Sequence, residues 1–449
     1  MADDGSLTTG TAAGAATGST ARGPLAQLFA NIGWLLAGRG VGAILSIVYL
    51  AIITQSLGPQ KFGQFAIILS TVQAIYGIIT FNTWQIIVRY GGPHVVAGRA
   101  DALGGLVRLM LKFELLAAIV GFAIALGALS FFAHRFGWEH TLLVQAIAFA
   151  AVHALSFRNS MTGLLRVHDR FRAATIGDSA LPIVRFVGSV LLLLIGAAHS
   201  LGAFLIVWAC SEAANALAIW WLVPKADRAM IRTAPRATMR ATLADYPGLL
   251  RFAVLTNVST TFAAVNQHIV TLAVGGFLGE AAAGFFRIGY QLGQALAKVA
   301  EALSKASYTE FSRLRAHGDA AALQRLLKQA NRIALVMAAV VIGTLLLVGR
   351  PALLLISGPA YLPALPLLQL LGIAAALDIL GSSYESALLS HDKAQWLLGA
   401  RIAGTVTLVI AFAAMVGHYG ATGAAGAVFA ASLVTAGLFV FLVRRINHA

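Results

Sequence analysis

The chain has 449 residues, of which 59% are hydrophobic and only 11% are charged. Soluble globular proteins carry about 25% charged residues, so this composition excludes a water-soluble enzyme or binding module and indicates a polytopic membrane protein. The net charge of +15 does not indicate nucleic-acid binding here, because membrane proteins collect Lys and Arg in short cytoplasmic loops.

The first 23 residues are rich in glycine, alanine and threonine and carry two aspartates near their start. A secretory signal peptide has a basic segment before an apolar core, and this segment has neither. We therefore expect residues 1–30 to form a disordered cytoplasmic tail ahead of the first membrane helix. The single cysteine, Cys210, permits no disulfide within the chain.

Twelve apolar segments are long enough to cross a bilayer, since a helix needs about 20 residues to span about 30 Å of hydrocarbon. Turn sequences such as LGPQKFG (57–63) and ISGPAY (356–361) separate them. We predict an all-α polytopic membrane protein with about twelve transmembrane helices, over residues 31–56, 62–89, 105–132, 140–163, 174–197, 201–223, 249–276, 284–310, 329–350, 361–388, 396–417 and 423–444.

Basic residues are unevenly distributed between the two sides of this predicted bundle. If the N-terminus lies inside, the outer loops hold only Lys61, Arg135 and Arg350, and the segments on the other side hold many more Lys and Arg residues. Cytoplasmic loops are the ones enriched in Lys and Arg. The distribution therefore predicts that both termini are cytoplasmic, which also requires an even number of helices.

The sequence repeats itself at a spacing of 221 residues. SLGPQKFGQFAIIL (56–69) returns as FLGEAAAGFFRIGY (277–290), and VHDR (167–170) is paralleled by SHDK (390–393) at nearly the same spacing. Both pairs fall in corresponding loops of the predicted bundle.

The repeat predicts two six-helix halves of the same topology. They are residues 31–223 and 249–445, joined by a basic cytoplasmic linker at 224–248. Halves that begin on the same side are related by a pseudo-twofold axis along the membrane normal, an arrangement typical of transporters.

Polar residues form a stripe along the eighth predicted helix. They recur at steps of three and four residues, which places them on one helix face over about 27 Å, nearly the thickness of the hydrocarbon. Charged groups facing lipid would be very costly. The stripe must therefore face protein or water, and it consists of Arg287, Gln291, Gln294, Lys298, Glu301 and Lys305.

Other predicted helices also carry polar faces, with Arg39 on the first, Gln73 on the second and His268 on the seventh. We expect these faces to line a central, water-filled cationic cavity suited to phosphate or pyrophosphate, which arginine binds through forked hydrogen bonds. The candidate substrate-binding residues are Arg39, Arg287, Lys298, Gln294, Gln291, Glu301, Gln73 and His268.

Each charge also has a purely structural interpretation. Lys298 and Glu301 are spaced to neutralise each other, Arg185 is spaced to pair with Asp178, and His268 could be a packed polar residue. Further acids that could pair with cations across helices are Glu212, Asp378 and Glu385.

Two His-Asp pairs, at 168–169 and 391–392, are interpreted as loop charges that cap helices. A metal site would need further ligands nearby, so we predict no metal.

The segment NIGWLLAGRGVGAILSIVYLAIITQSLGPQKFGQFAIILS (31–70), with its LGPQKFG turn, resembles oligosaccharide flippases of the Wzx type. ISGPAYLPALPLLQLLGI (356–373) is similar to the short loop that precedes the tenth helix of that family. These flippases belong to the multidrug/oligosaccharidyl-lipid/polysaccharide exporter superfamily, with the MATE transporters and lipid II flippases. The resemblance covers residues 31–445.

The resemblance implies a MATE-like bundle that opens alternately to each side. It implies an inner-membrane flippase that moves an undecaprenyl-pyrophosphate-linked oligosaccharide for surface polysaccharides such as O-antigen, lipopolysaccharide or exopolysaccharide. Basic residues in the lumen would hold the pyrophosphate, with Arg39, Arg287 and Lys298 as the matching candidates. The family pattern is not matched in the seventh helix, where NQH (266–268) offers no carboxylate for ion coupling.

Two other functions remain as alternatives. A MATE-like drug or cation antiporter would need an acidic lumen, and a membrane glycosyltransferase or polymerase would need a large polar loop. We expect a transporter without covalent catalysis or cofactor. Its expected partners are an anionic lipid-linked oligosaccharide and the bilayer, with polysaccharide polymerase or export machinery as candidate proteins. We expect no nucleic acid and a monomer.

Overall fold

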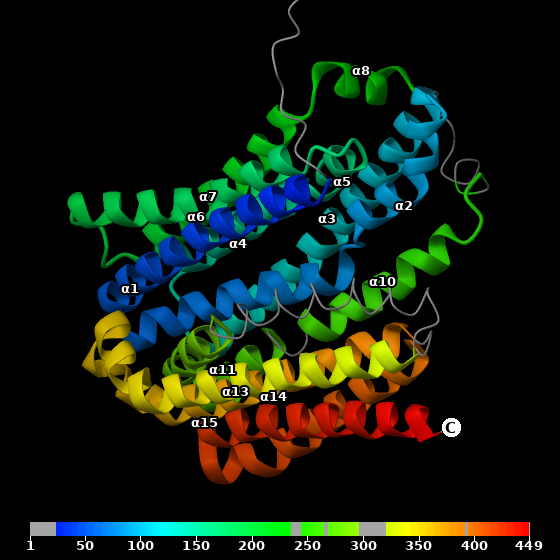
Figure 1. The fold of residues 1–449 in the computed structure, drawn as a ribbon. Helices are drawn as coiled ribbons and strands as arrows, with labels where there is room; N and C mark the ends of the chain where they lie inside the picture. The colour runs from blue at the N-terminus through cyan, green and yellow to red at the C-terminus, as the bar shows by residue number, and fades with distance from the viewer. Residues whose placement is uncertain are drawn as a thin grey trace, which may run out of the picture.

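The computed structural model describes residues 24–234, 243, 245–264, 268–295, 320–390 and 394–448. Nearly all of these residues are helical, and none of them lies in a strand (Figure 1). The helices are α1 (Pro24–Ile79), α2 (Thr83–Val96), α3 (Ala100–Phe136), α4 (His140–Leu155), α5 (Asn159–Val167), α6 (Phe171–Leu194), α7 (Leu201–Leu222), α8 (Lys225–Thr233), α10 (Leu249–Ala264), α11 (Val270–Leu278), a helix over residues 280–295, α13 (Ala320–Ser357), the 3-10 helix η2 (Pro359–Ala364), α14 (Leu365–Ser390) and α15 (Ala394–His448).

Within the described residues, eight helical segments are long and apolar enough to cross a membrane. The first and last of them, Val41–Val96 and Gln395–Arg445, have 56 and 51 residues. The last is this long because α15 bends at Gly420 without an intervening loop, and the first because α1 bends at Gly58 in the same way and is followed by α2 after a three-residue break. The all-α membrane fold is confirmed. The prediction of twelve helices is approximate, since the predicted helices over 249–276 and 284–310 lie partly outside the described residues.

The backbone bears out the internal repeat at its two matched glycines. Gly58 has φ 70° and ψ 173°, and Gly279, 221 residues later, has φ 93° and ψ 172°. Only glycine adopts this region at low cost. The two LG turns therefore bend the chain in the same way, once in each half.

The two bends bring the halves together at what we call the kink seam. A Cβ atom placed on Gly63 would lie 1.8 Å from the carbonyl oxygen of Glu280, and one on Gly284 would lie 2.6 Å from the carbonyl oxygen of Pro59. Glu280 and Gly284 follow Pro59 and Gly63 at the repeat spacing of 221. The contact is therefore made twice, as a twofold axis through the seam requires.

Polar contacts extend the kink seam to the end of α13 and to η2. The Gln55 Nε2 atom donates to the Leu355 and Ile356 carbonyls at 2.8 and 3.0 Å. The Tyr361 hydroxyl, from a side chain that is 1% exposed, donates to the Thr54 carbonyl at 3.4 Å. In Figure 1 the bend of α1 lies at the left end of the bundle, opposite the C-terminus.

Two of the predicted spans are interrupted within the N-terminal half. The predicted helix over 62–89 stops at Ile79 and restarts at Thr83, and the one over 140–163 stops at Leu155 and restarts at Asn159. Side chains and nearby amides satisfy the freed backbone groups, as the bilayer interior demands. One of them, the Trp220 Nε1 atom, donates to the Phe157 carbonyl at 2.6 Å.

The breaks lie between two separate hydrophobic clusters. One cluster joins α1, α3, α4 and α7 of the N-terminal half to α13, η2, α14 and the 280–295 helix. It includes Phe62, Trp208 and Tyr361. The other joins α2, α3, α5 and α8 to the start of α10, through residues such as Met110 and Leu249. The first turns of α10 therefore pack on the N-terminal half.

The linker between the halves is held to α3 at its start. The Arg108 guanidinium donates to the carbonyls of Arg232 and Ala234 at 2.9 and 2.6 Å, and also to that of Ile231. These carbonyls end α8, where a cation is favourable.

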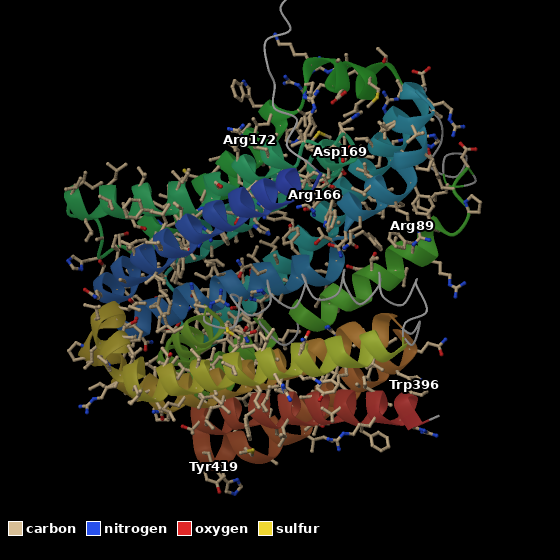
Figure 2. All side chains as sticks on the ribbon, in the orientation of Figure 1. Arg89, Arg166, Asp169, Arg172, Trp396 and Tyr419 are labelled. Atoms are coloured by element: carbon tan, nitrogen blue, oxygen red, sulfur yellow. The ribbon has the colours of Figure 1, made fainter. Side chains whose placement is uncertain are left out.

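Figure 2 shows Arg89 on α2 and Trp396 on α15 at the end of the bundle where the C-terminus lies.

Candidate functional site

Arg287 is the best-defined of the predicted cavity residues. It lies on the helix over residues 280–295, and its Nη1 atom is buried without a hydrogen-bond partner among the described residues. It interacts electrostatically with Tyr290 on its own helix, and with Tyr49 and Arg185 of the N-terminal half. A second cation, Arg185, is therefore close enough to interact with Arg287.

His268 lies beside this arginine. Its side chain is 8% exposed, its Nδ1 atom has no partner in the described part of the chain, and it interacts electrostatically with Arg287. The two residues come from different helices of the C-terminal half and both carry an unused buried nitrogen. Unused polar atoms of this kind are uncommon in folded proteins, and they indicate a place where a polar ligand or water is bound.

The three predicted glutamines lie within the described residues. Gln291 and Gln294 follow Arg287 at helical spacing and are half-buried. Gln73, on α1, has a buried Oε1 atom that lacks a hydrogen-bond donor within the described residues. Tyr290 interacts with both Arg287 and Asp378, so one acid of the C-terminal half lies near this tyrosine.

Three predicted residues are not tested by the structure. Arg39 lies in α1, but its side chain is outside the described part of the molecule, and Lys298 and Glu301 lie outside the described residues altogether. The central water-filled cavity stays a prediction. His391 and Asp392 are also outside the described residues, whereas His168 Nε2 lies 3.8 Å from Asp227 Oδ1 in α8. No group of ligands for a metal ion occurs among the residues that the structure describes.

A second group of charges, which the sequence did not single out as a site, lies in the N-terminal half. Glu212 of α7 is 2% exposed and accepts from the Arg158 Nη1 atom at 2.6 Å and from the Arg185 Nη2 atom at 3.0 Å. The His153 Nδ1 atom is 3.5 Å from the same carboxylate. The structure thus gives Glu212 as the partner of Arg185, where spacing had suggested Asp178.

Aromatic rings hold Arg185 between this group and Arg287. The Arg185 guanidinium carbon lies 4.9 Å from the centre of the Trp208 ring, and Tyr49 meets the same ring edge-on at 5.3 Å. Arginine over an aromatic face is stabilised by the ring's negative face. Arg158 and Arg185 share the single carboxylate of Glu212, and Arg287 interacts with Arg185 from the other half, so three arginines are grouped in this part of the interior.

Glu114 of α3 joins the two restarted helices. Its Oε1 atom accepts from the Thr83 hydroxyl at 2.5 Å, where α2 begins, and from the Ser160 amide and hydroxyl at 2.7 and 2.6 Å, where α5 begins. An acidic group is favourable at a helix N-terminus because it meets unpaired amides and the positive end of the helix dipole. Because one carboxylate binds the starts of both α2 and α5, the two helix breaks lie side by side in the bundle.

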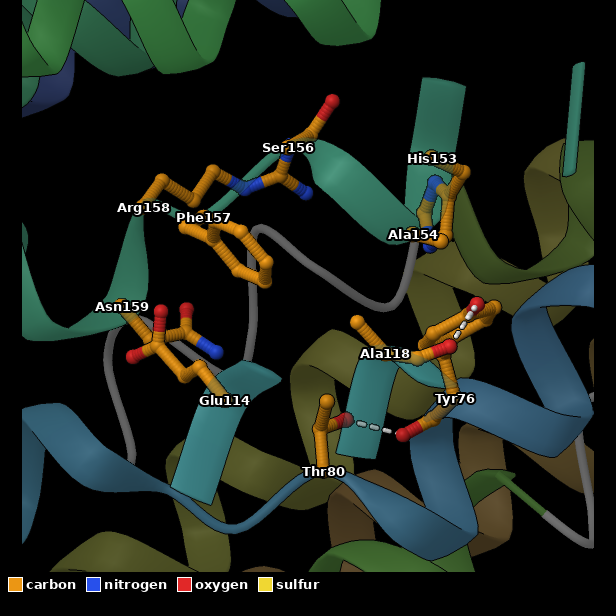
Figure 3. Close-up of a pocket in the computed structure, with 10 residues that line it drawn as sticks. All are labelled: Tyr76, Thr80, Glu114, Ala118, His153, Ala154, Ser156, Phe157, Arg158 and Asn159. Atoms are coloured by element: carbon orange, nitrogen blue, oxygen red, sulfur yellow. Dashed lines mark hydrogen bonds between the residues drawn. The ribbon is translucent and has the colours of Figure 1, made fainter. Parts of the chain in front are cut away.

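A cavity of about 120 Å³ lies beside these breaks (Figure 3). Its wall includes Glu114, Arg158 and His153, with Tyr76 from the last turn of α1 and Thr80 just after it. The cavity is large enough for a few water molecules. All of its lining residues belong to the N-terminal half.

Comparison with known proteins gives a consistent picture. A model of the family described as "Polysaccharide biosynthesis protein" matches residues 28–315. "Inner membrane protein YghQ" of Escherichia coli (strain K12) is 26% identical over 349 residues, which are 78% of this chain and 97% of that protein.

Two solved structures show the same fold. An inward-facing MATE family transporter superposes with a TM-score of 0.75 at 17% identity, covering 90% of this chain and 95% of the other. The lipid II flippase MurJ in an inward closed conformation superposes with a TM-score of 0.72 at 13% identity, covering 91% of this chain and 87% of the other.

Proposed function

The chain belongs to the polysaccharide biosynthesis protein family of membrane transporters, and from that membership we propose that it is a flippase for a lipid-linked oligosaccharide. The substrate would be an undecaprenyl-pyrophosphate-linked glycan, carried from the cytoplasmic to the outer leaflet of a bacterial inner membrane. Its prenyl tail would stay in lipid while the charged headgroup and glycan cross between the halves.

The observation that carries this proposal is the cationic group formed by Arg185 and Arg287. The two arginines come from opposite halves and interact with each other, although like charges repel strongly where water is scarce. Arg287 also keeps an unused Nη1 atom. A diphosphate between the two guanidiniums would remove the repulsion and fill the unused donor position, since arginine pairs readily with phosphate oxygens.

The arrangement also suggests how binding is linked to movement. An anion held by one arginine from each half is bound best when the halves approach each other, and less well when they separate. A ligand with unequal affinity for two conformations shifts the balance between them. In this way the substrate itself would favour the occluded state during alternating access.

Transport in proteoliposomes tests the proposal directly. We expect Arg287→Gln and Arg185→Gln each to slow translocation of a fluorescent prenyl-pyrophosphate oligosaccharide by about tenfold or more, because a hydrogen bond to a charged group contributes about 1.5–3 kcal/mol. Arg287→Lys should retain part of the rate. Arg135→Gln, an exposed change near the end of α3, is the matched control and should transport normally.

The same vesicles separate the flippase from the drug or cation antiporter. An antiporter would exchange a cationic dye and leave the lipid-linked glycan in its starting leaflet. Wild-type rates of glycan translocation in both arginine variants would contradict the binding role of Arg185 and Arg287. Dye exchange without glycan translocation would contradict the flippase proposal.

A further inference from the structure

Glu280 connects the two halves at the kink seam. It is the first residue of the helix over 280–295, in the C-terminal half, and its side chain is 6% exposed. Its Oε2 atom accepts from the Gln60 and Gln64 Nε2 atoms at 2.5 and 3.1 Å, and its Oε1 atom accepts from the Trp138 Nε1 atom. All three donors belong to the N-terminal half.

Local geometry presents the donors to the carboxylate. Gln60 and Gln64 are four residues apart after the bend of α1, so they lie on one helix face. Trp138 follows Gly137, whose left-handed conformation (φ 65°) ends α3 and turns the chain toward the seam. The backbone contact between Gly63 and Glu280 places the carboxylate close to all three donors.

The polar contact is one-sided, although the backbone contact is symmetric. The residue that corresponds to Glu280 in the N-terminal half is Pro59, which has no polar side chain, and those that correspond to Gln60 and Gln64 are Ala281 and Phe285. The repeat alone therefore explains why the helices cross here, and it does not explain the carboxylate with its three donors.

The chemistry of the contact suits a closure that must open again. The carboxylate is satisfied by three uncharged N–H donors, and it forms no ion pair with a Lys or Arg among the described residues. Hydrogen bonds with water can replace those with uncharged donors when a seam opens to solvent. A buried ion pair, by contrast, leaves an uncompensated charge when it is broken.

We propose that Glu280, Gln60, Gln64 and Trp138 form a latch that holds the kink seam shut and must release when this end of the transporter opens. The latch rests on the proposed function, because only alternating access requires the seam to open. It would set the proportion of molecules open at this end, independently of the arginines that bind the substrate.

Distances between spin labels across the seam test the latch in the full-length protein. One label replaces exposed Lys61 of the N-terminal half and the other replaces Tyr419, 66% exposed, near the bend of α15. Replacing Cys210 with serine removes the only other cysteine. The distance distribution is measured by pulsed electron paramagnetic resonance in lipid nanodiscs without substrate.

We expect Glu280→Ala to raise the ratio of the long-distance to the short-distance population about tenfold or more. Hydrogen bonds to a carboxylate stabilise the closed seam by at least about 1.4 kcal/mol, and losing that energy changes the equilibrium tenfold. Glu280→Gln should give an intermediate shift. Trp138→Phe keeps the ring and removes only the N–H group, so it should produce a smaller shift in the same direction.

Glu139→Gln is the matched control. This exposed carboxylate is adjacent to Trp138 and contacts the Thr141 hydroxyl at 3.3 Å within its own half, so its removal should leave the distances unchanged. If Trp138 acts through Glu280, the double variant should open no more than Glu280→Ala alone.

Wild-type distances in both Glu280→Ala and Trp138→Phe would overturn the latch, as would full additivity of the two changes. If Glu280→Ala does not fold, wild-type distances in Trp138→Phe and Gln64→Leu overturn it. Because the readout needs no substrate, a seam that opens in these variants of a protein that moves no glycan would support the latch while contradicting the proposed function.

Discussion

Arg185 and Glu212 form a buried ion pair between α6 and α7, with Nη2 and Oε1 3.0 Å apart. Glu212 is shared with Arg158 at 2.6 Å, so the group keeps an excess of positive charge inside the bundle. Buried ion pairs contribute little net stability compared with apolar residues of the same size. Their presence in a membrane interior is therefore better explained by binding than by folding.

Replacing Arg185 and Glu212 separately and together should separate a role in folding from a role in binding. We expect Glu212→Leu to destabilise the protein by about 3–5 kcal/mol, because it leaves the buried Arg185 without its carboxylate. Arg185→Met should destabilise less, because Glu212 keeps its ion pair with Arg158. The double variant should lose less than the sum of the two. Thermal unfolding in detergent measures the stabilities. A double variant that regains stability and still fails to transport glycan would indicate a binding role for Arg185.

Glu114 should matter for stability through the two helices that it joins. Glu114→Ala leaves the Ser160 amide and two hydroxyls unpaired in a buried site, at a cost of about 1–3 kcal/mol for each buried group. Glu114→Gln keeps an accepting oxygen and should recover part of the loss. Melting temperatures compare the variants, with exposed Glu139→Ala as the control. Equal melting temperatures for all three would contradict this account of the helix breaks.

The close approach of the backbones at the kink seam predicts that two glycine substitutions destabilise the protein to different extents. Gly63→Ala would bring a methyl group to 1.8 Å from the Glu280 carbonyl oxygen, and Gly284→Ala would bring one to 2.6 Å from that of Pro59. We expect both to destabilise by about 1–3 kcal/mol or to force the seam apart, with Gly63→Ala the more severe. The spin-label distances report the second outcome. Gly127→Ala, which meets no atom within 4 Å, should be tolerated.

The two repeated bends predict that replacing either glycine lowers stability by a similar amount, through backbone strain. A Cβ on Gly58 or on Gly279 would touch nothing within 4 Å, so the penalty comes from the backbone conformation alone. We expect Gly58→Ala and Gly279→Ala to cost similar amounts, about 1–3 kcal/mol each. Unfolding experiments on the two variants check the equality, and a difference larger than the penalty itself would show that the bends are not equivalent.

Much of the fold could be predicted because it depends on local chemistry. Runs of apolar residues predict membrane helices, and the LG segments, repeated 221 residues apart, predicted turns at corresponding places in the two halves. The structure has Gly58 and Gly279 there in the same backbone conformation. The helix breaks at residues 80–82 and 156–158 could not be predicted in this way. Each break holds only a few polar residues, Thr80 and Asn82 in one and Ser156 and Arg158 in the other, within a long apolar span. The group that stabilises both restarts, Glu114, comes from a distant part of the chain.

The candidate site was predictable only in part for the same reason. Helical spacing placed Arg287, Gln291 and Gln294 on one face, and the structure brings His268 to Arg287. The sequence did not indicate that Arg185 would interact electrostatically with Arg287, because the two residues belong to different halves. Whether Arg39, Lys298 and Glu301 share the site stays a prediction.

The one-sided carboxylate at the seam has a consequence for the origin of the protein. If the two halves descend from one duplicated unit, identical copies would have made the same side-chain contacts on both sides of the axis. The present chain makes the carboxylate contact on one side only, because Pro59, Ala281 and Phe285 stand at the positions that correspond to Glu280, Gln60 and Gln64. The side chains of this closure have therefore diverged between the halves, whereas the backbone crossing beneath them has kept its symmetry.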